Sequence, residues 1–144
     1  MPPIEDFIQA IAIGNIYWFV NPKITSLEPH PHVCLGIYDN DCVFMICGTS
    51  NFAGRQRFFE LNGLPFETLV RIQPNPTNTL NRDTFIDCNQ VQTHDVGDLY
   101  YNETLNQAGV VTDAELQQIQ DGIRMSELLE QVIQNQILRA FPEL

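Results

Sequence analysis

Two short apolar runs stand out in the pattern of hydrophobic and polar positions along the chain. Residues 33–38 and 42–47 are rich in β-branched, aromatic and cysteine side chains, and each run is too short for a helix. The intervening Asp39-Asn40-Asp41 tolerates left-handed backbone, so the pattern predicts two strands joined by a tight hairpin. Because both runs are almost continuously apolar, we expect the hairpin to be covered on both faces and to form the core.

Further short strands are predicted before and after this hairpin. Residues 16–20 form the first strand, Asn21-Pro22 ends it, and the loop 21–31 follows. Residues 51–57 and 73–78 are polar and are predicted to be loops. The other predicted strands are residues 58–61, 68–72 and 83–88, of which the last runs on into residues 89–95. Five or six short strands with closely spaced turns are typical of a small, strongly curved sheet or barrel.

The N-terminal segment and the link before the C-terminal region have different patterns. Apolar residues between positions 4 and 13 recur at helical spacing, which predicts a short amphipathic helix that ends at Gly14. Residues 97–111 show no regular period. We therefore expect an irregular link in which Tyr100 and Tyr101 anchor the chain.

The C-terminal part of the chain shows helical periodicity. Thr112 and Glu115 have the spacing of a capping box, and apolar residues then continue at steps of three and four. Gly122 and Ser126 are expected to mark a break between two helices. We interpret Met125 and the leucines of this region as core contacts, not as a partner-binding stripe.

Length and composition fit one α+β domain. A chain of 144 residues with 44% hydrophobic content can bury roughly two-thirds of its unfolded surface. We divide it into a β-barrel core, residues 14–99, and a C-terminal helical pair, residues 112–141. The sequence has no run of eighteen apolar residues and no basic segment before an apolar one. We therefore expect neither a membrane span nor a secretory signal, and a cytoplasmic protein.

The cysteines and histidines show no metal-binding pattern. Four cysteines lack C-x-x-C spacing and three histidines have no matching ligand spacing, so no metal site and no cofactor are expected. Some registers of the hairpin place Cys34 opposite Cys47. We nevertheless expect free thiols, because buried free cysteines are the common state in a reducing compartment.

The net charge of −11 disfavours a nucleic-acid partner, because affinity for phosphate comes largely from Lys and Arg. The charge is uneven, however. Residues 51–82 contain four arginines and two glutamates, so this segment carries +2 while both ends of the chain are acidic. Two interpretations follow, a local basic face or arginines that solvate the outer face of a sheet.

No standard enzyme motif is present, neither a phosphate loop nor a dinucleotide fingerprint, G-x-S-x-G or H-E-x-x-H.

Four short motifs do follow one another. They are Gly14-Asn15-Ile16-Tyr17-Trp18-Phe19-Val20 with the turn Asn21-Pro22, then Glu28-Pro29-His30-Pro31, then Gly48-Thr49-Ser50-Asn51, and LNRDTFIDCNQVQTHD at residues 80–95. Their order and spacing over residues 14–99 resemble the MazF/PemK family of toxins from bacterial toxin-antitoxin pairs.

This resemblance implies a fold, partners and an activity. The fold it implies is an SH3-like barrel with helices packed on it, in a homodimer that also binds a cognate antitoxin protein. The activity it implies is metal-independent cleavage of single-stranded RNA, in which the ribose 2′-hydroxyl attacks its own phosphate. Such chemistry needs a base, an acid for the leaving 5′-oxygen and donors for the phosphorane, and it needs no bound metal.

The sequence departs from the family where catalysis is concerned. His30 stands in place of a loop arginine, and a histidine can act as base or acid near neutral pH. Asp87 and Asn89 stand where the PemK branch carries an arginine and an aspartate. A structural alternative for Asp87 is an ion pair with Arg71 or Arg82 across the sheet. The candidate catalytic residues are His30, His32 and Thr49, and the candidate substrate contacts are Lys23, Ser50, Asn51, Arg55 and Asn89.

Two other functions stay open. A barrel of this kind that has lost catalysis would bind a protein or peptide through the groove beside Thr49 and the loop 21–31. The acidic balance and the residues Asp87 and Asn89 favour this hypothesis. The third hypothesis is a structural or regulatory homodimer whose C-terminal helices form the interface.

Overall fold

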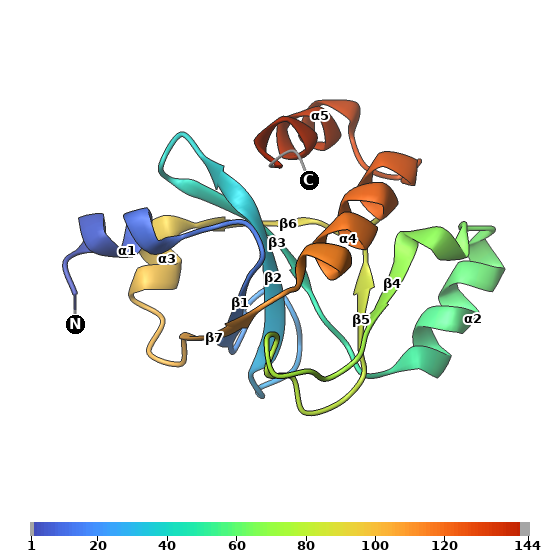
Figure 1. Cartoon of the computed structure of the whole chain (residues 1–144), viewed down its shortest axis with the longest axis horizontal. Helices are drawn as coiled ribbons and strands as arrows, with labels where there is room; N and C mark the ends of the chain where they lie inside the picture. The colour runs from blue at the N-terminus through green and yellow to red at the C-terminus, as the bar shows by residue number, and fades with distance from the viewer. Residues whose placement is uncertain (1, 142–144) are drawn as a thin grey trace.

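Residues 2–141 are described by the computed structural model and form an α+β fold with two antiparallel sheets (Figure 1). The larger sheet has the strand order β6-β3-β2-β1-β7. Its strands are β1 (Asn15–Phe19), β2 (His30–Tyr38), β3 (Cys42–Cys47), β6 (Gln92–Asp95) and β7 (Asn106–Val110). The smaller sheet is a hairpin of β4 (Leu69–Ile72) and β5 (Thr84–Asp87). The helices are α1 (Ile4–Ala10), α2 (Phe52–Asn62), α3 (Val96–Tyr100), α4 (Asp113–Met125) and α5 (Gln131–Ala140), with a short 3-10 turn η1 (Phe66–Thr68).

The predicted central hairpin is confirmed. β2 and β3 pair antiparallel, and Asp39 and Asn40 in the turn have left-handed φ angles of 53° and 58°. β2 begins earlier than expected, because residues 30–32 also pair with β1. Cys34 lies opposite Met45, and the cysteines are free thiols as predicted.

Both faces of this hairpin are buried, as its continuous apolarity predicts. Leu35 and Ile46 belong to a cluster that also contains residues of α4 and α5. Cys34, Val43 and Met45 belong to a second cluster, which residues of α1 and α3 cover. Figure 1 shows α4 and α5 packed on one side of the sheet, with α1 and α3 side by side at one end of the molecule.

Residues 51–62 do not form the predicted loop and strand. They form α2, in which Asn51 caps the first turn by accepting a hydrogen bond from Gly54 N at 3.0 Å. Gly63, with a φ of 62°, ends the helix. The adjacent Phe58 and Phe59 imitate a strand, but Phe59 alone of the α2 side chains is buried, so capping and helix propensity outweigh the short apolar run.

Residues 97–111 are not the predicted irregular link either. Asp95 caps α3, and β7 pairs with β1 at the edge of the sheet. β7 is partly exposed and has the sequence NQAGV, so it lacks the apolar run from which the other strands were predicted. The Tyr100 hydroxyl donates to the Pro2 carbonyl and anchors the chain as predicted, whereas Tyr101 is 70% exposed.

The C-terminal helical pair is confirmed in its start and in its break. Thr112 and Glu115 form the predicted capping box, and α4 ends with Ser126 as its cap. Gly122 lies inside α4 and does not break it. A Cβ at this position would lie 2.7 Å from Cys88 Sγ, so the glycine permits close packing of α4.

Two residues of the C-terminal helical region, Met125 and Leu128, are not the core contacts that the sequence predicts. Met125 is 46% exposed and Leu128 is 57% exposed, whereas Leu129 packs partly against the core. The buried residues of the two helices include Leu116, Ile119, Ile123 and Ile137. Within residues 2–141, no helix has the length and apolar character needed to cross a membrane.

The smaller sheet joins the larger one just after β3. Thr49 and Phe85 exchange two backbone hydrogen bonds, with N···O distances of 3.1 and 2.7 Å. Gly48 N donates to Pro31 O at 2.7 Å, which brings the start of β2 to the same point. Among the described residues, no further strand pairs with the outer edges of β6 and β7, so the strands form an open sheet plus a hairpin, not a closed barrel.

Gly48→Ala is expected to lower the free energy of unfolding by about 1–3 kcal/mol, because a buried methyl group that overlaps its neighbours forces the backbone to shift. The new Cβ would lie 2.5 Å from Thr84 Cγ2 and 3.2 Å from Pro31 O. Urea denaturation measures the loss. Gly63→Ala is the matched control, because it meets no atom within 4 Å and bears only the cost of its positive φ. A smaller loss for Gly48→Ala than for the control would contradict the close approach at this corner.

Candidate functional site

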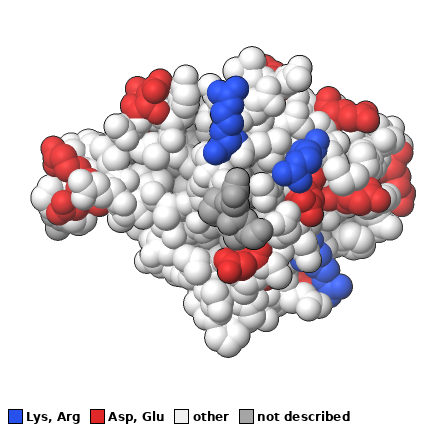
Figure 2. All heavy atoms as spheres, turned by 45° about the horizontal axis from the view of Figure 1, so that its top comes forward, with Lys and Arg blue, Asp and Glu red and all other residues white. Residues whose placement is uncertain are grey.

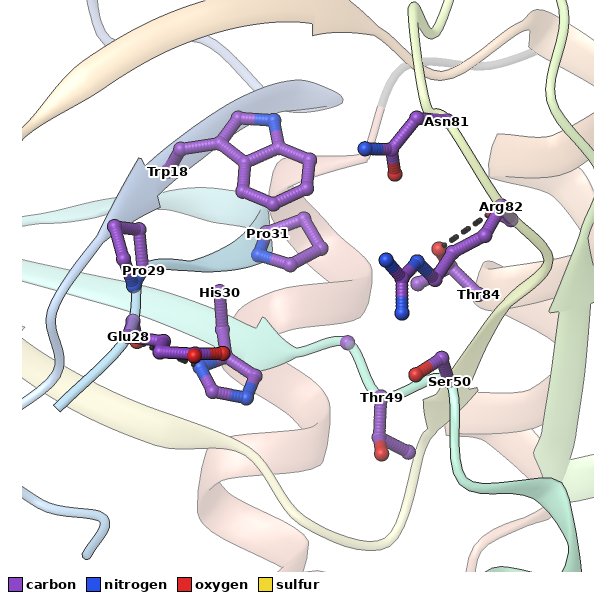
Figure 3. A pocket seen from close by; sticks show the side chains of 11 residues that line it. Trp18, Glu28, Pro29, His30, Pro31, Thr49, Ser50, Asn81, Arg82 and Thr84 are labelled. Atoms are coloured by element: carbon purple, nitrogen blue, oxygen red, sulfur yellow. Dashed lines mark hydrogen bonds between the residues drawn. The ribbon is translucent and has the colours of Figure 1, made fainter. Parts of the chain in front are cut away.

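A cleft surrounds the corner that Gly48, Thr49 and Ser50 make after β3. It consists of two hollows, of about 180 Å³ and about 260 Å³, that share His30, Gly48 and Thr49. The first lies between His30 and the segment that leads into β5 (Figure 3), and the second extends toward Arg55 on α2. We call the two hollows together the corner cleft. It contains several of the predicted site residues.

His30 forms one wall of the corner cleft. It is the first residue of β2, opposite Phe19, and its ring is half-buried. Its Nδ1 lies 2.9 Å from the carbonyl oxygen of Glu28. Because a carbonyl oxygen only accepts, Nδ1 carries the proton and the neutral ring keeps its lone pair on Nε2. Figure 3 shows that this second nitrogen faces Thr49, so His30 can take up a proton inside the cleft.

Arg82 forms the opposite wall. Its carbonyl oxygen accepts a hydrogen bond from Thr84 Oγ1 at 3.1 Å, which fixes the backbone just before β5. The side chain extends into the first hollow above Ser50 (Figure 3). Within residues 2–141, the ion pairs of the structure do not include Arg82, so its guanidinium can bind an anion.

The loop that carries Arg82 is held by a buried amide. Asn78 is fully buried, and its Nδ2 donates to Gln73 O at 2.9 Å and to Glu115 Oε2 at 3.0 Å. Its Oδ1 accepts from Leu80 N at 3.0 Å. These bonds tie the loop between β4 and β5 to the first turn of α4, which limits the positions open to Arg82.

Between the two walls lie hydroxyl groups and one indole. The Ser50 hydroxyl points into the first hollow, while the Thr49 side chain points away from Arg82 (Figure 3). Thr49 Oγ1 accepts from Asn51 N at 3.1 Å and keeps its own proton for donation. Trp18, opposite Pro31 in the strand register, lines the same hollow and offers a flat aromatic surface.

Arg55 and Asn89 are engaged in other bonds. Arg55 Nη1 lies 3.4 Å from Asp87 Oδ2 in a partly buried ion pair. The Asn89 side chain donates to Asp87 and to Thr68 and accepts from Ser126 Oγ at 2.6 Å, all within the protein. The expected partners of Asp87, Arg71 and Arg82, are therefore wrong: Arg71 pairs with Asp83.

His32 lies behind the cleft and does not line it. Its ring is fully buried and stacks on Phe19 with a centroid distance of 3.9 Å. Nδ1 donates to His30 O at 2.8 Å, and Nε2 accepts from Asn21 Nδ2 at 3.0 Å. Burial, aided by the nearby His94, lowers the pKa of His32 to about 4. This geometry gives His32 a structural role under His30.

The two other predicted contacts, Lys23 and Asn51, differ in where they lie. Lys23 Nζ donates to the carbonyl oxygen of Thr93 and lines a separate hollow beside Asp95. Asn51 lines the second hollow of the corner cleft, where its side chain caps α2. The structure thus brings together His30, Thr49, Ser50, Asn51 and Arg55 and leaves out His32, Lys23 and Asn89.

The side chains of the corner cleft that sequence analysis missed include Trp18, Glu28 and Arg82. Each lies within a motif that the sequence analysis identified. Their convergence depends on the pairing of β1 with β2 and on the bridge between Thr49 and Phe85. A register prediction for the first two strands would have placed Trp18 beside the loop that contains Glu28.

No protein-family model matches this sequence, and no curated protein matches it. Within the part of the chain that the structure describes, no three His, Cys, Asp or Glu side chains gather in a way that would hold a metal ion. The polar side chains of the corner cleft include a histidine, arginines, hydroxyl groups, amides and carboxylates.

Acid is expected to destabilise the fold through His32. Its pKa of about 4 in the folded state lies below the ordinary 6.5, so the unfolded chain binds the proton more tightly. The contribution of the neutral His32 ring to the free energy of unfolding is therefore fully present above pH 6.5. It is lost as the pH falls toward 4, by about 3 kcal/mol for this one group. Urea denaturation from pH 7.5 to 4 should show a shallower dependence for His32→Gln than for the unaltered protein. Equal slopes would contradict the neutral buried ring.

Proposed function

We propose that this protein is a MazF/PemK-like endoribonuclease that cleaves single-stranded RNA at the corner cleft without a metal ion. The observation that carries this proposal is the position of His30 and Arg82 on opposite walls of one cleft. His30 has an Nε2 lone pair that can act as a base, and Arg82 has a guanidinium that forms no ion pair with the described residues and can hold a phosphate.

The proposed reaction is an internal transesterification. His30 Nε2 takes the proton of the ribose 2′-hydroxyl, and this oxygen attacks the adjacent phosphorus. The bond from phosphorus to the 5′-oxygen breaks, and the leaving oxygen takes a proton from water at the open side of the cleft. The products are a 2′,3′-cyclic phosphate and a 5′-hydroxyl. Arg82, together with the hydroxyl group of Ser50, stabilises the added negative charge of the phosphorane.

Trp18 supports a preference for single strands. Trp18 is half-buried, and the part of its indole that lines the hollow can stack on an unpaired base of any kind. Trp18 and Arg82 line the same hollow, so a base and the neighbouring phosphate would bind there together.

The same resemblance extends the proposal to the fold and to partners. We propose that the open sheet and the β4-β5 hairpin correspond to an SH3-like barrel, that the chain forms a homodimer, and that a cognate antitoxin protein binds it. The bridge between Thr49 and Phe85 supports the first of these, because it joins the two sheets at one corner.

A second candidate is a protein-binding or regulatory module without catalysis. The observation that favours it is the ion pair of Arg55 with Asp87, which neutralises one of the two arginines of the cleft. Figure 2 shows few and separate basic side chains on the face that it displays, consistent with the net charge of −11.

Incubation with mixed-sequence single-stranded RNA in excess EDTA tests the proposed activity. We expect fragments that end in a 2′,3′-cyclic phosphate. His30→Ala is expected to lower the rate by about 10²–10⁴-fold, the usual contribution of a general base. Arg82→Ala is expected to lower it by about 10²–10³-fold, because it removes one donor to the transition state. Arg124→Ala is the matched control, since Arg124 pairs with Asp121 on the surface of α4.

Intact RNA with no binding at low salt would contradict the nuclease proposal and favour the protein-binding module. Equal activity of all three variants would also contradict it, because the corner cleft would then not be the site.

The salt dependence of RNA binding gives an independent prediction. Each phosphate contact to a single strand contributes about 0.7 to the slope of log K against log salt. Among the described residues Arg82 forms no ion pair, so Arg82→Ala should reduce the slope by about 0.7, whereas Arg124→Ala should leave it unchanged. Fluorescence anisotropy of a labelled oligonucleotide at several salt concentrations measures the slopes. Identical slopes for Arg82→Ala and the unaltered protein would contradict a phosphate at this arginine.

A further inference from the structure

A second cavity lies at the end of the molecule that carries α1 and α3, and it shares no lining residue with the corner cleft. It has a volume of about 550 Å³ and lies between these two helices and the strands β1 and β7. Figure 1 shows α1 and α3 side by side at this end. Its volume is within the range of about 300–1,000 Å³ that is usual for small-molecule sites.

The walls of this cavity are aromatic and apolar. The rings of Phe7 on α1 and Tyr100 on α3 lie 5.6 Å apart between centroids and are tilted by 55°. Leu105, just before β7, completes the apolar surface. Aromatic walls of this kind favour a flat ligand, because ring faces and edges pack closely against it.

Tyr17 offers a hydrogen-bond donor that the protein itself does not use. The side chain is 3% exposed, and its hydroxyl oxygen accepts from Asn15 Nδ2 at 3.2 Å. Within residues 2–141, no acceptor receives the hydroxyl proton. Tyr17 and Asn15 both line the cavity, so the O–H group stands at its wall. An unused donor at a buried position is costly, and a ligand acceptor would remove that cost.

Three further side chains of the cavity offer acceptor oxygens. The carboxylate of Glu103 is exposed at the rim and takes part in no ion pair among the described residues. Gln107 Nε2 donates to Gly109 O at 2.9 Å, which leaves its Oε1 free. Asn15 likewise uses its Nδ2, bonded to Ala10 O and to Tyr17, so its Oδ1 is free.

The electrostatics of this end disfavour an anionic ligand. No Lys or Arg among residues 2–141 lines the cavity. The first turn of α1 carries Glu5 and Asp6, and that of α3 carries Asp98. Figure 2 shows acidic side chains gathered at this end without a basic one on the visible face. A ligand with a phosphate would be repelled, whereas N–H and amino groups meet acceptors.

We propose that this cavity binds a planar nitrogen heterocycle of nucleobase or nucleoside size that carries amino or ring N–H groups and no phosphate. The flat ring lies against Phe7 and Tyr100, a ring nitrogen or carbonyl accepts from the Tyr17 hydroxyl, and the amino group donates to Glu103 and Gln107. This site is independent of the corner cleft and of the proposed RNA cleavage.

Titration of the ¹⁵N-labelled full chain with adenosine, followed by NMR, tests this proposal. We expect shifts of backbone signals of α1, α3 and β7. AMP is expected to bind about tenfold more weakly, because its phosphate meets the acidic end. Tyr17→Phe removes one hydrogen bond, and Glu103→Gln replaces a charge-assisted hydrogen bond by a weaker neutral one, so each is expected to weaken adenosine binding about five- to tenfold. Tyr38→Phe, at an exposed tyrosine of β2, is the matched control.

Several outcomes would overturn the proposal. They are the absence of any shift at millimolar adenosine, shifts confined to the Trp18 indole in the corner cleft, equal affinities for AMP and adenosine, and unchanged affinity in both variants. Glu103→Gln keeps the test valid if Tyr17→Phe lowers stability, because Glu103 is exposed. RNA cleavage measured on the same variants should stay unchanged, so failure of this site and failure of the nuclease proposal are distinguishable.

Discussion

The two backbone hydrogen bonds between Thr49 and Phe85 are the constraint on which the corner cleft depends. They join the end of β3 to β5 and so fix the distance between the two sheets. Gly48 makes the approach possible, because any larger residue would collide with Thr84. His30 on the β2 side and Arg82 on the β5 side therefore face each other across a corner. Backbone hydrogen bonds hold this corner, so its geometry does not depend on the side chains at positions 30 and 82.

Buried polar groups hold each wall of the cleft in place. On one side, the ring of His32 donates to the carbonyl of His30 and accepts from Asn21. On the other side, Asn78 binds the loop before Arg82 to Glu115 on α4. The described residues contain no buried side-chain nitrogen or oxygen without a partner. Fully bonded networks of this kind rigidify a site, because loss of one partner leaves the others unpaired at a cost.

Local signals in the sequence found the central hairpin and the capping box at Thr112, because in both cases the evidence lies within a few residues. They missed β7, whose strand character comes from its pairing with β1 and not from its own residues. His30 and His32 show the same limit. Both lie on one face of β2, and their spacing does not reveal that Phe19 stacks on His32 while His30 stands at the open end of the strand.

The acidity of the chain and the proposed phosphate site at Arg82 are compatible, because they act over different distances. Charges more than about 8–10 Å apart at the surface are largely screened at physiological salt. The acidic end at α1 and α3 therefore slows the approach of an RNA more than it weakens a phosphate in contact with Arg82. A long polyanion would also place further phosphates over acidic surface. The charge distribution thus favours short single-stranded segments that fit within the cleft over duplexes that extend beyond it.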